Sequence, residues 1–178
     1  MLLTSKKLGA IMKLNRFAVT WRICKYIKGD IAMFGKKSQP AAGKGPAFEV
    51  LDLVVNELNA RNLKFDLSDD KPVIFIKFSG DHINGQSFTL IIDDDGESVA
   101  LRVFSIFKFE AGQLADAYEF CNKVNNQYRW MRFYVDSDDE FTAAIDAVIT
   151  PSTAGAECVE ILGRAVNIVD SVYGELMA

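Results

Sequence analysis

The alternation of apolar and polar positions is clearest between Gly112 and Ile149, where it predicts an amphipathic helix followed by a two-stranded hairpin. Apolar residues first recur every three or four positions, the spacing that places them along one side of a helix. The helix should end near Asn126, because asparagine tolerates the left-handed conformation that closes helices. The period then changes to two on both sides of a polar turn at 136–139, which indicates paired strands. The helical stripe comprises Leu114, Ala117, Tyr118, Cys121, Val124, Asn125 and Tyr128, of which only Asn125 is strongly polar.

A second helix and three strands are predicted upstream of this unit. The helix begins at Ala47, has acidic residues in its first turn where the helix dipole favours them, and ends near Asn62. The loops at 80–85 and 93–98 are short and rich in turn residues, so the strands they join should pair antiparallel. The strands span residues 73–79, 86–92 and 99–108, after a short extended piece at 64–67.

A third helix is predicted at the end of the sequence. Thr150 before Pro151 is typical of an N-cap followed by proline at the first helical position. Gly155 and Gly163 lie inside this helix at a cost in stability, so we expect them to permit close approach to the sheet. The order α-β-β-β-α-β-β-α predicts an α+β fold, in which an antiparallel sheet of about five strands has helices packed on one face.

The net charge of −4 hides two different parts of the chain. Residues 1–46 hold ten Lys/Arg and one acidic residue, which gives +9, whereas residues 47–178 hold ten Lys/Arg and 23 Asp/Glu, which gives −13. We therefore expect residues 47–178 to form a single domain and residues 1–46 to be a basic N-terminal extension with a flexible linker at 35–46.

The basic extension has no apolar run long enough for a membrane span or a signal-peptide core. Its basic and apolar residues spread around the helical wheel, which disfavours a membrane-surface helix, and it lacks the serine content of a transit peptide. We favour an over-extended reading frame with the true start at Met12 or Met33, which would leave the extension outside the native fold.

No stretch of the sequence carries a catalytic signature. His82 is the only histidine, and a dyad with Asp81 is conceivable, but adjacent loop side chains have poor geometry for catalysis, so we interpret His82 as a solvated turn residue. Residues 93–97 lack the ligand spacing of an EF-hand, and Asp95-Gly96 is a hairpin signal. Three cysteines without paired spacing favour neither a disulfide framework nor a zinc site, and they suit the cytoplasm. We therefore predict no enzyme, no metal and no cofactor.

Surface composition favours partner binding. In three of the predicted strands one alternating set of residues contains the charges, and we assign that set to the face away from the helices. This set mixes aromatic residues with arginine, as protein interfaces do. Alternatively, a helix or the N-terminal segment covers this face. The predicted partner-binding residues are Phe75, Arg102, Phe104, Ile106, Trp130, Arg132 and Tyr134.

The central helix and hairpin also carry a family resemblance. Asn122-Lys123-Val124-Asn125 and the run from Trp130 to Asp136 resemble the asparagine-marked helix end, aromatic strand and acidic turn of the YbjN family. The resemblance covers residues 47–178 in element order and implies a type III secretion chaperone-like fold. It also implies the family's role, described as sensory transduction regulation and, by fold, as chaperone-like partner binding; it brings no catalytic residues.

We therefore expect a non-enzymatic protein-binding or chaperone-like regulatory module, forming a homodimer and recognising a segment of an unknown protein partner. The alternative is a nucleic-acid-binding module, in which the basic tail holds phosphates and the aromatic sheet face stacks bases. The charge of −13 on residues 47–178 opposes that alternative, because affinity for nucleic acid comes largely from neutralising phosphates.

Overall fold

The computed structural model describes residues 45–178, which form three helices on a six-stranded sheet. The helices are α3 (Pro46–Ala60), α4 (Leu114–Gln127) and α5 (Ala154–Met177), with a 3-10 turn, η1 (Ala111–Gln113), before α4. The strands are β1 (Asp66–Leu67), β2 (Val73–Phe78), β3 (Gln86–Ile92), β4 (Ser98–Lys108), β5 (Arg132–Val135) and β6 (Glu140–Val148). The expectations for residues 1–44 lie outside the described residues.

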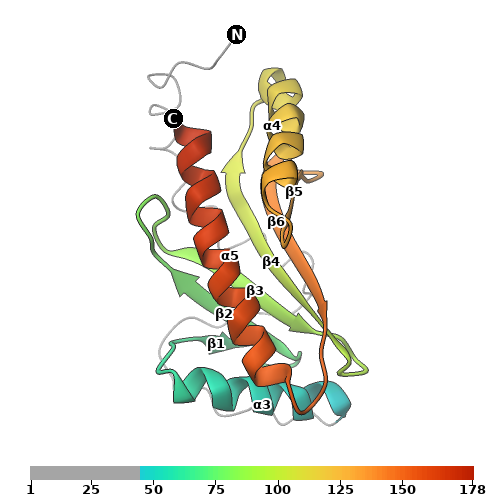
Figure 1. Ribbon diagram of the computed structural model, residues 1–178. Coiled ribbons are helices and arrows are strands. Elements are labelled where there is room, and N and C mark those ends of the chain that lie inside the picture. The colour runs from blue at the N-terminus through green and yellow to red at the C-terminus, as the bar shows by residue number, and fades with distance from the viewer. Residues whose placement is uncertain (1–44) are drawn as a thin grey trace.

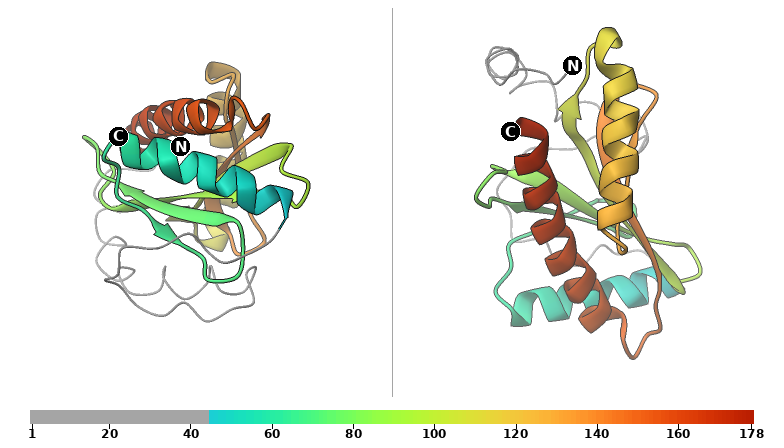
Figure 2. Two further views of the ribbon diagram at one scale, coloured as in Figure 1. Left: turned by 90° about the horizontal axis from the view of Figure 1, so that it is seen from below. Right: turned by 45° about the horizontal axis from the view of Figure 1, so that its top comes forward.

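All strand pairs are antiparallel, in the spatial order β1-β2-β3-β4-β6-β5. Helices α4 and α5 lie in front of the strands in Figure 1, and the left view of Figure 2 shows α3 and α5 together on one side of the sheet. The predicted α+β class, the element order and the helix-covered face are thus confirmed. The sheet has six strands rather than about five, because the extended piece after α3 pairs with β2.

Local sequence signals determine where α3 begins and ends. Pro46 occupies the start of the helix, where its missing N–H costs nothing. Asn62 follows the end with a φ of 56°, a left-handed conformation that asparagine tolerates. The left-handed end predicted at Asn126 was wrong, because α4 continues through Asn126 to Gln127 and ends at Tyr128 with a φ of −112°. Gly96 turns β3 into β4 with a φ of 72°, and a Cβ atom there would lie 3.0 Å from the Pro46 backbone. Glycine therefore lets this hairpin pass close to the first turn of α3.

One apolar core fills the space between the helices and the sheet. Toward β5 the core becomes aromatic: the Phe141 ring of β6 stacks on Phe133 of β5 at 5.3 Å between centroids. Phe120 of α4 lies 5.8 Å from the same ring, and Phe109 lies 6.1 Å from it. Since burying a phenylalanine contributes about 2–3 kcal/mol, this group anchors α4 on the sheet.

Helix α5 begins later than predicted. Residues 151–153 form a turn, and the Thr150 carbonyl accepts hydrogen bonds from the backbone N–H groups of Thr153 (3.0 Å) and Ala154 (2.8 Å). The Thr150 hydroxyl contacts the Ser152 and Thr153 hydroxyls instead of helical N–H groups. The predicted N-cap at Thr150 was therefore wrong, because this threonine closes a separate turn before the helix.

The two glycines predicted to approach the sheet do not do so. A Cβ atom on Gly155 would lie 3.0 Å from the Cβ atom of Glu57 and 3.1 Å from the Leu53 carbonyl oxygen, so this glycine allows α5 to pack closely on α3. Nothing lies within 4 Å of a Cβ atom on Gly163, which is exposed. The prediction was wrong because the helical pattern alone does not show that Gly155 faces α3 and that Gly163 faces solvent.

Candidate protein-binding surface

The face of the sheet opposite the helices, which we call the outer face, brings three of the predicted binding residues into one row. Phe75 of β2 pairs with Thr89, Thr89 pairs with Arg102, Arg102 pairs with Ala144, and Ala144 pairs with Arg132 of β5. Thr89 is only 1% exposed, and its hydroxyl has no hydrogen-bond partner in the described part of the chain. The small residues of the row are thus buried between the larger Phe75, Arg102 and Arg132.

Asp146 of β6 joins the two arginines of this row. Its Oδ1 atom lies 2.6 Å from Arg102 Nη2, and its Oδ2 atom accepts a hydrogen bond from Arg132. Arg102 also donates to the Ile145 carbonyl at 3.0 Å. Two guanidinium groups sharing one carboxylate leave a local excess of one positive charge. Sequence reasoning did not single out Asp146, although it is the only acid on the interior of a strand otherwise composed mainly of Ala, Ile, Thr and Val.

Tyr134 occupies the next row, opposite Thr142 of β6. Its side chain is 39% exposed, and burial of the remainder raises the pKa of the phenol, while Arg102 and Arg132 act in the opposite direction. The hydroxyl is therefore protonated at neutral pH and able both to donate and to accept a hydrogen bond. Phe104 of β4 follows Val103, which pairs with Ala143, and is half-buried.

Ile106 was predicted to be exposed with Phe104, and this was wrong. Its side chain is 7% exposed and belongs to the apolar core. The register of β4 shifts between Val103 and Phe107, so three residues oppose a single residue of β6, and Ser105 there has a φ of 53°. A two-residue period cannot be carried through such a bulge, which is why alternation misplaced Ile106.

Trp130 was predicted to lie beside Arg132 and Tyr134, and the structure separates it from them. It precedes β5, whose first paired residue is Arg132. Its ring lies 5.1 Å from the guanidinium carbon of Arg129 and 5.0 Å from that of Arg164, which belongs to α5. The ring therefore faces the helix side of the molecule. The prediction failed because alternation does not extend to residues outside the strand.

Asn125, the polar member of the α4 stripe, binds the edge of the sheet. Its side-chain amide donates to the Phe133 carbonyl at 2.9 Å and accepts from the Phe133 N–H at 2.7 Å. Both backbone groups point away from β6, so without Asn125 they would form an open strand edge. The asparagine thus seals β5 against α4, a function that its place in an apolar stripe hinted at but did not define.

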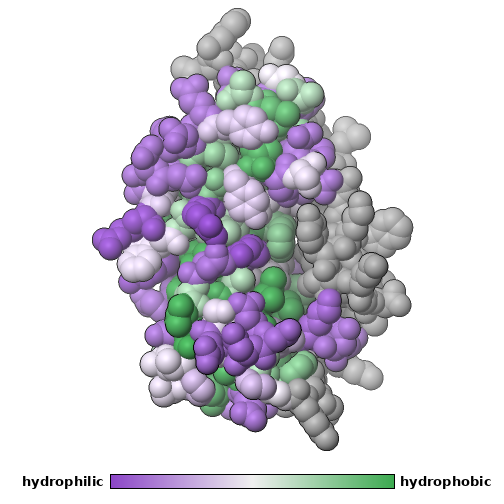
Figure 3. Space-filling view, turned by 90° about the vertical axis from the view of Figure 1, so that its right-hand side faces the viewer, coloured by the Kyte–Doolittle hydropathy of each residue, from purple (hydrophilic) through white to green (hydrophobic). Residues whose placement is uncertain are grey.

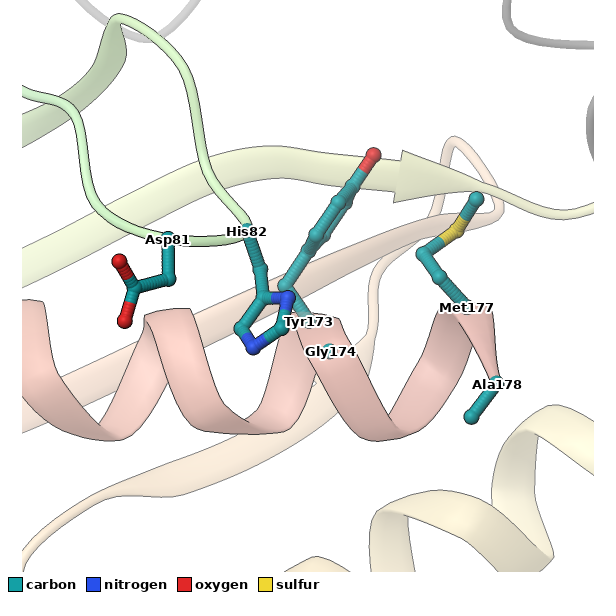
Figure 4. Close-up of a pocket in the computed structure, with 6 residues that line it drawn as sticks. All are labelled: Asp81, His82, Tyr173, Gly174, Met177 and Ala178. Carbon is teal, nitrogen blue, oxygen red and sulfur yellow. The ribbon is translucent and has the colours of Figure 1, made fainter.

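The loop that contains His82 docks on α5. The Asp170 carboxylate accepts hydrogen bonds from the backbone N–H groups of His82 (2.8 Å) and Ile83 (2.9 Å), and more weakly from that of Asp81 (3.3 Å). These bonds, led by that of Ile83, lower the pKa of Asp170. Figure 4 shows the His82 ring over Gly174, where a Cβ atom would lie 2.8 Å from the ring.

His82 is therefore exposed, as predicted, but it lies against a helix rather than extending into solvent. It forms one wall of a shallow hollow at the end of α5, together with Asp81, Tyr173, Gly174, Met177 and Ala178. Among the described residues that line this hollow there is no serine or cysteine. Its side chains do not form the nucleophile and base pair that a hydrolase needs.

Residues 45–178 contain no group of three or more His, Cys, Asp or Glu side chains able to hold a metal ion. Cys121 and Cys158 are buried free thiols. Burial raises the pKa of Cys121 to about 11 and that of Cys158 to about 12, so neither is a thiolate at neutral pH.

Figure 3 views the molecule from the side on which α4 lies. Apolar side chains form patches there that hydrophilic side chains separate. In the described part of the chain, no helix combines the length and the apolar character needed to cross a membrane.

Comparison with known proteins places this geometry in context. A family model described as "YbjN: Putative bacterial sensory transduction regulator" matches residues 51–176. No curated protein matches the chain. The crystal structure of YbjN from E. coli, called a "putative transcription regulator", is similar with a TM-score of 0.52 and 9% identity, over 70% of this chain and 89% of that one. This likeness shows the fold alone.

A second solved structure also shows similarity to this chain. It is the Yersinia pestis type III secretion chaperone SycH in complex with a fragment of YscM2. The TM-score is 0.47 and the identity 15%, over 69% of this chain and 98% of that one.

Proposed function

The chain belongs to the YbjN family, and from this premise we propose that residues 45–178 form a non-enzymatic, protein-binding regulatory module working in the cytoplasm. The module recognises a segment of a partner protein, or a second copy of itself, through the outer face of the sheet. The family description supports a regulatory role.

The observation that carries the proposal is the alignment of Phe75, Arg102 and Arg132 across five strands, with Tyr134 in the adjoining row. Arginine and tyrosine are enriched among the residues that dominate binding energy at protein interfaces. Asp146 pairs with both arginines and restricts their orientations, which lowers the side-chain entropy lost when a partner binds. The outer face is thus a pre-organised surface that mixes aromatic area with charge.

The charge of residues 47–178 favours a protein partner over nucleic acid. These residues carry −13, and Asp146 neutralises one of the two arginine charges on the outer face. Binding to a nucleic-acid backbone requires many uncompensated Lys and Arg side chains along one surface. A protein segment with both apolar and polar side chains needs only a few such groups.

The test compares two tyrosine variants. Tyr134→Ser alters the outer face, whereas Tyr118→Ser removes an exposed tyrosine from α4 and serves as the matched control. Each variant is measured by sedimentation equilibrium for self-association and by co-purification from the native cell for partner capture. The far-ultraviolet dichroism of each verifies that it is folded.

We expect Tyr134→Ser to weaken self-association or partner capture by at least about tenfold, because a central aromatic side chain at an interface is worth on the order of 2 kcal/mol. Tyr118→Ser should behave as the unaltered chain. Equal behaviour of the two variants would refute the outer face as the binding surface. Salt-sensitive binding of a single-stranded oligonucleotide that survives removal of residues 1–46 would favour the nucleic-acid alternative.

A further inference from the structure

Trp130 is a large aromatic side chain that remains 51% exposed although two cations hold it in place. We propose that Trp130, Arg129 and Arg164 form a second binding site, apart from the outer face, for an acidic peptide segment of a partner protein. The segment would place a large apolar side chain against the indole ring and a carboxylate on Arg129. This inference goes beyond the proposed function, because it needs no residue of the outer face.

The two arginines differ in their pairing. Arg164 forms an ion pair with Glu160 on the same helix at 2.6 Å. For Arg129, the only interaction found in the described part of the chain is its contact with the Trp130 ring. The planar guanidinium of Arg129 therefore keeps its N–H donors available, and this group binds a carboxylate through two parallel hydrogen bonds.

The indole ring contacts two cations. The two guanidinium carbons lie 5.1 Å and 5.0 Å from the ring, within the range of favourable cation–π contact. The contact with Arg164 fixes the ring to α5, although the residue itself lies outside β5. A half-exposed tryptophan flanked by arginine is a combination that is enriched at the energetic centres of protein interfaces.

The arginine charges are unevenly compensated over the molecule. Residues 45–178 contain five arginines, of which Arg61 lies beyond the end of α3 and pairs with Glu57. Arg102 and Arg132 lie on the outer face, where they share the Asp146 carboxylate. At the proposed site Arg164 is paired with Glu160, whereas no described carboxylate pairs with Arg129, which leaves an excess of one positive charge beside the indole ring. This charge favours a carboxylate ligand, although the domain as a whole is acidic.

The small number of cations at the proposed site favours a short acidic peptide over a nucleic acid. A peptide with two or three carboxylates needs few cations, and at physiological ionic strength charges more than about 8 Å away are largely screened. A nucleic acid extends its phosphates over a longer path, where the surrounding charge of −13 would oppose it.

The experiment uses the full chain carrying Trp21→Phe, so that fluorescence reports only Trp130, the other of the two tryptophans. The probe is an acetylated octapeptide of alternating glutamate and leucine, and the matched peptide has glutamine in place of glutamate. Arg129→Ala tests the proposed carboxylate contact, and Arg61→Ala is the matched control for loss of one arginine. Tyr134→Ser shows whether the outer face takes part.

We expect the glutamate peptide to change Trp130 fluorescence saturably and the glutamine peptide to bind at least about tenfold more weakly. Arg129→Ala should weaken glutamate-peptide binding by about tenfold, since a hydrogen-bonded charge contributes on the order of 1.5 kcal/mol. Arg61→Ala and Tyr134→Ser should leave it unchanged. Binding to the basic tail alone would not alter the fluorescence of Trp130.

Equal affinity for the two peptides, or equal effects of Arg129→Ala and Arg61→Ala, would overturn the proposal. A larger fluorescence change with a single-stranded oligonucleotide than with the peptide would overturn it in favour of base stacking. Loss of the peptide-induced fluorescence change in Tyr134→Ser would show that the peptide binds through the outer face, and would overturn a separate site. Failure of the outer-face test above would leave the present prediction intact, so the two are distinguishable.

Discussion

Replacing Asn125 with alanine should loosen the junction between α4 and the edge strand β5. The side chain makes two hydrogen bonds to the Phe133 backbone, at 2.9 Å and 2.7 Å. Each contributes about 1 kcal/mol net, which gives about 2 kcal/mol for the pair. Alanine favours a helix over asparagine by roughly 0.5 kcal/mol. The free energy of unfolding should therefore fall by about 1.5 kcal/mol.

Asn126→Ala is the matched control for this change. Asn126 is the next residue of α4, and its side chain donates only to the exposed Asn122 carbonyl of the same helix. The gain in helix propensity is the same, and no strand bond is lost. Equilibrium urea unfolding, followed by dichroism and by fluorescence, measures both variants under one condition. Their difference then isolates the contribution of the bonds to Phe133.

A difference below about 0.5 kcal/mol between the two variants would refute the sealing role of Asn125, because exposed substitutions commonly vary by that amount. Asn125→Ala should also self-associate more readily, since it frees the N–H and carbonyl groups of Phe133 at an edge strand. Dilution should reverse this association. Loss of stability without any such association would show that α4 covers the edge even without its asparagine.

Four further outcomes are expected. Asp170→Asn should lower the free energy of unfolding by about 1 kcal/mol at neutral pH, because a charged acceptor of three backbone N–H groups becomes neutral. The folded pKa of Asp170 lies below its ordinary value of 3.8, so this loss should shrink as the pH of the unfolding experiment falls below about 4. His82→Ala should cost well under about 1 kcal/mol, because its backbone N–H, not its ring, binds Asp170; if it abolished a reproducible activity, the binding-module proposal would fail. Thr89→Val should leave the free energy of unfolding in urea unchanged or raise it by up to about 1 kcal/mol, since it removes a buried hydroxyl that has no hydrogen-bond partner among residues 45–178; a clear decrease would reveal a hydrogen bond. Removing residues 1–46 should leave the melting temperature nearly unchanged, and a large decrease would show that this segment packs on the sheet.

The helices and strands were predictable because each depends mainly on the pattern of neighbouring residues in the sequence. Residues with a period of 3.6 or 2 formed the expected helices and strands, and Asn62 and Gly96 adopted the left-handed conformations expected of asparagine and glycine at a chain reversal. The predicted N-cap at Thr150 was wrong because an N-cap signal describes the preference of one residue, whereas the start of α5 depends on a turn that also involves Thr153.

Contacts between distant segments could not be predicted in the same way. Asp170 binds a loop nearly ninety residues earlier, and Gly174 is a glycine because the His82 ring lies over it. Asn125 signalled an interaction by being polar within an apolar stripe, but its partner Phe133 depends on how α4 packs beside β5. A single sequence contains the donors and acceptors of such contacts but not their pairing.

The candidate binding residues show the same difference between positions set by strand alternation and positions set by contacts between distant segments. Phe75, Arg102, Arg132 and Tyr134 lie within paired strands, so alternation placed them together, whereas Trp130 lies before β5 and faces α5. A double substitution of Phe104 and Trp130 would therefore change two surfaces at once, and a loss of binding could not be assigned to either. Phe104→Ser should affect binding through the outer face, whereas Trp130→Ser should affect only acidic-peptide binding. If each single variant instead abolished both kinds of binding, the two surfaces would have to act as one continuous site around the edge of β5.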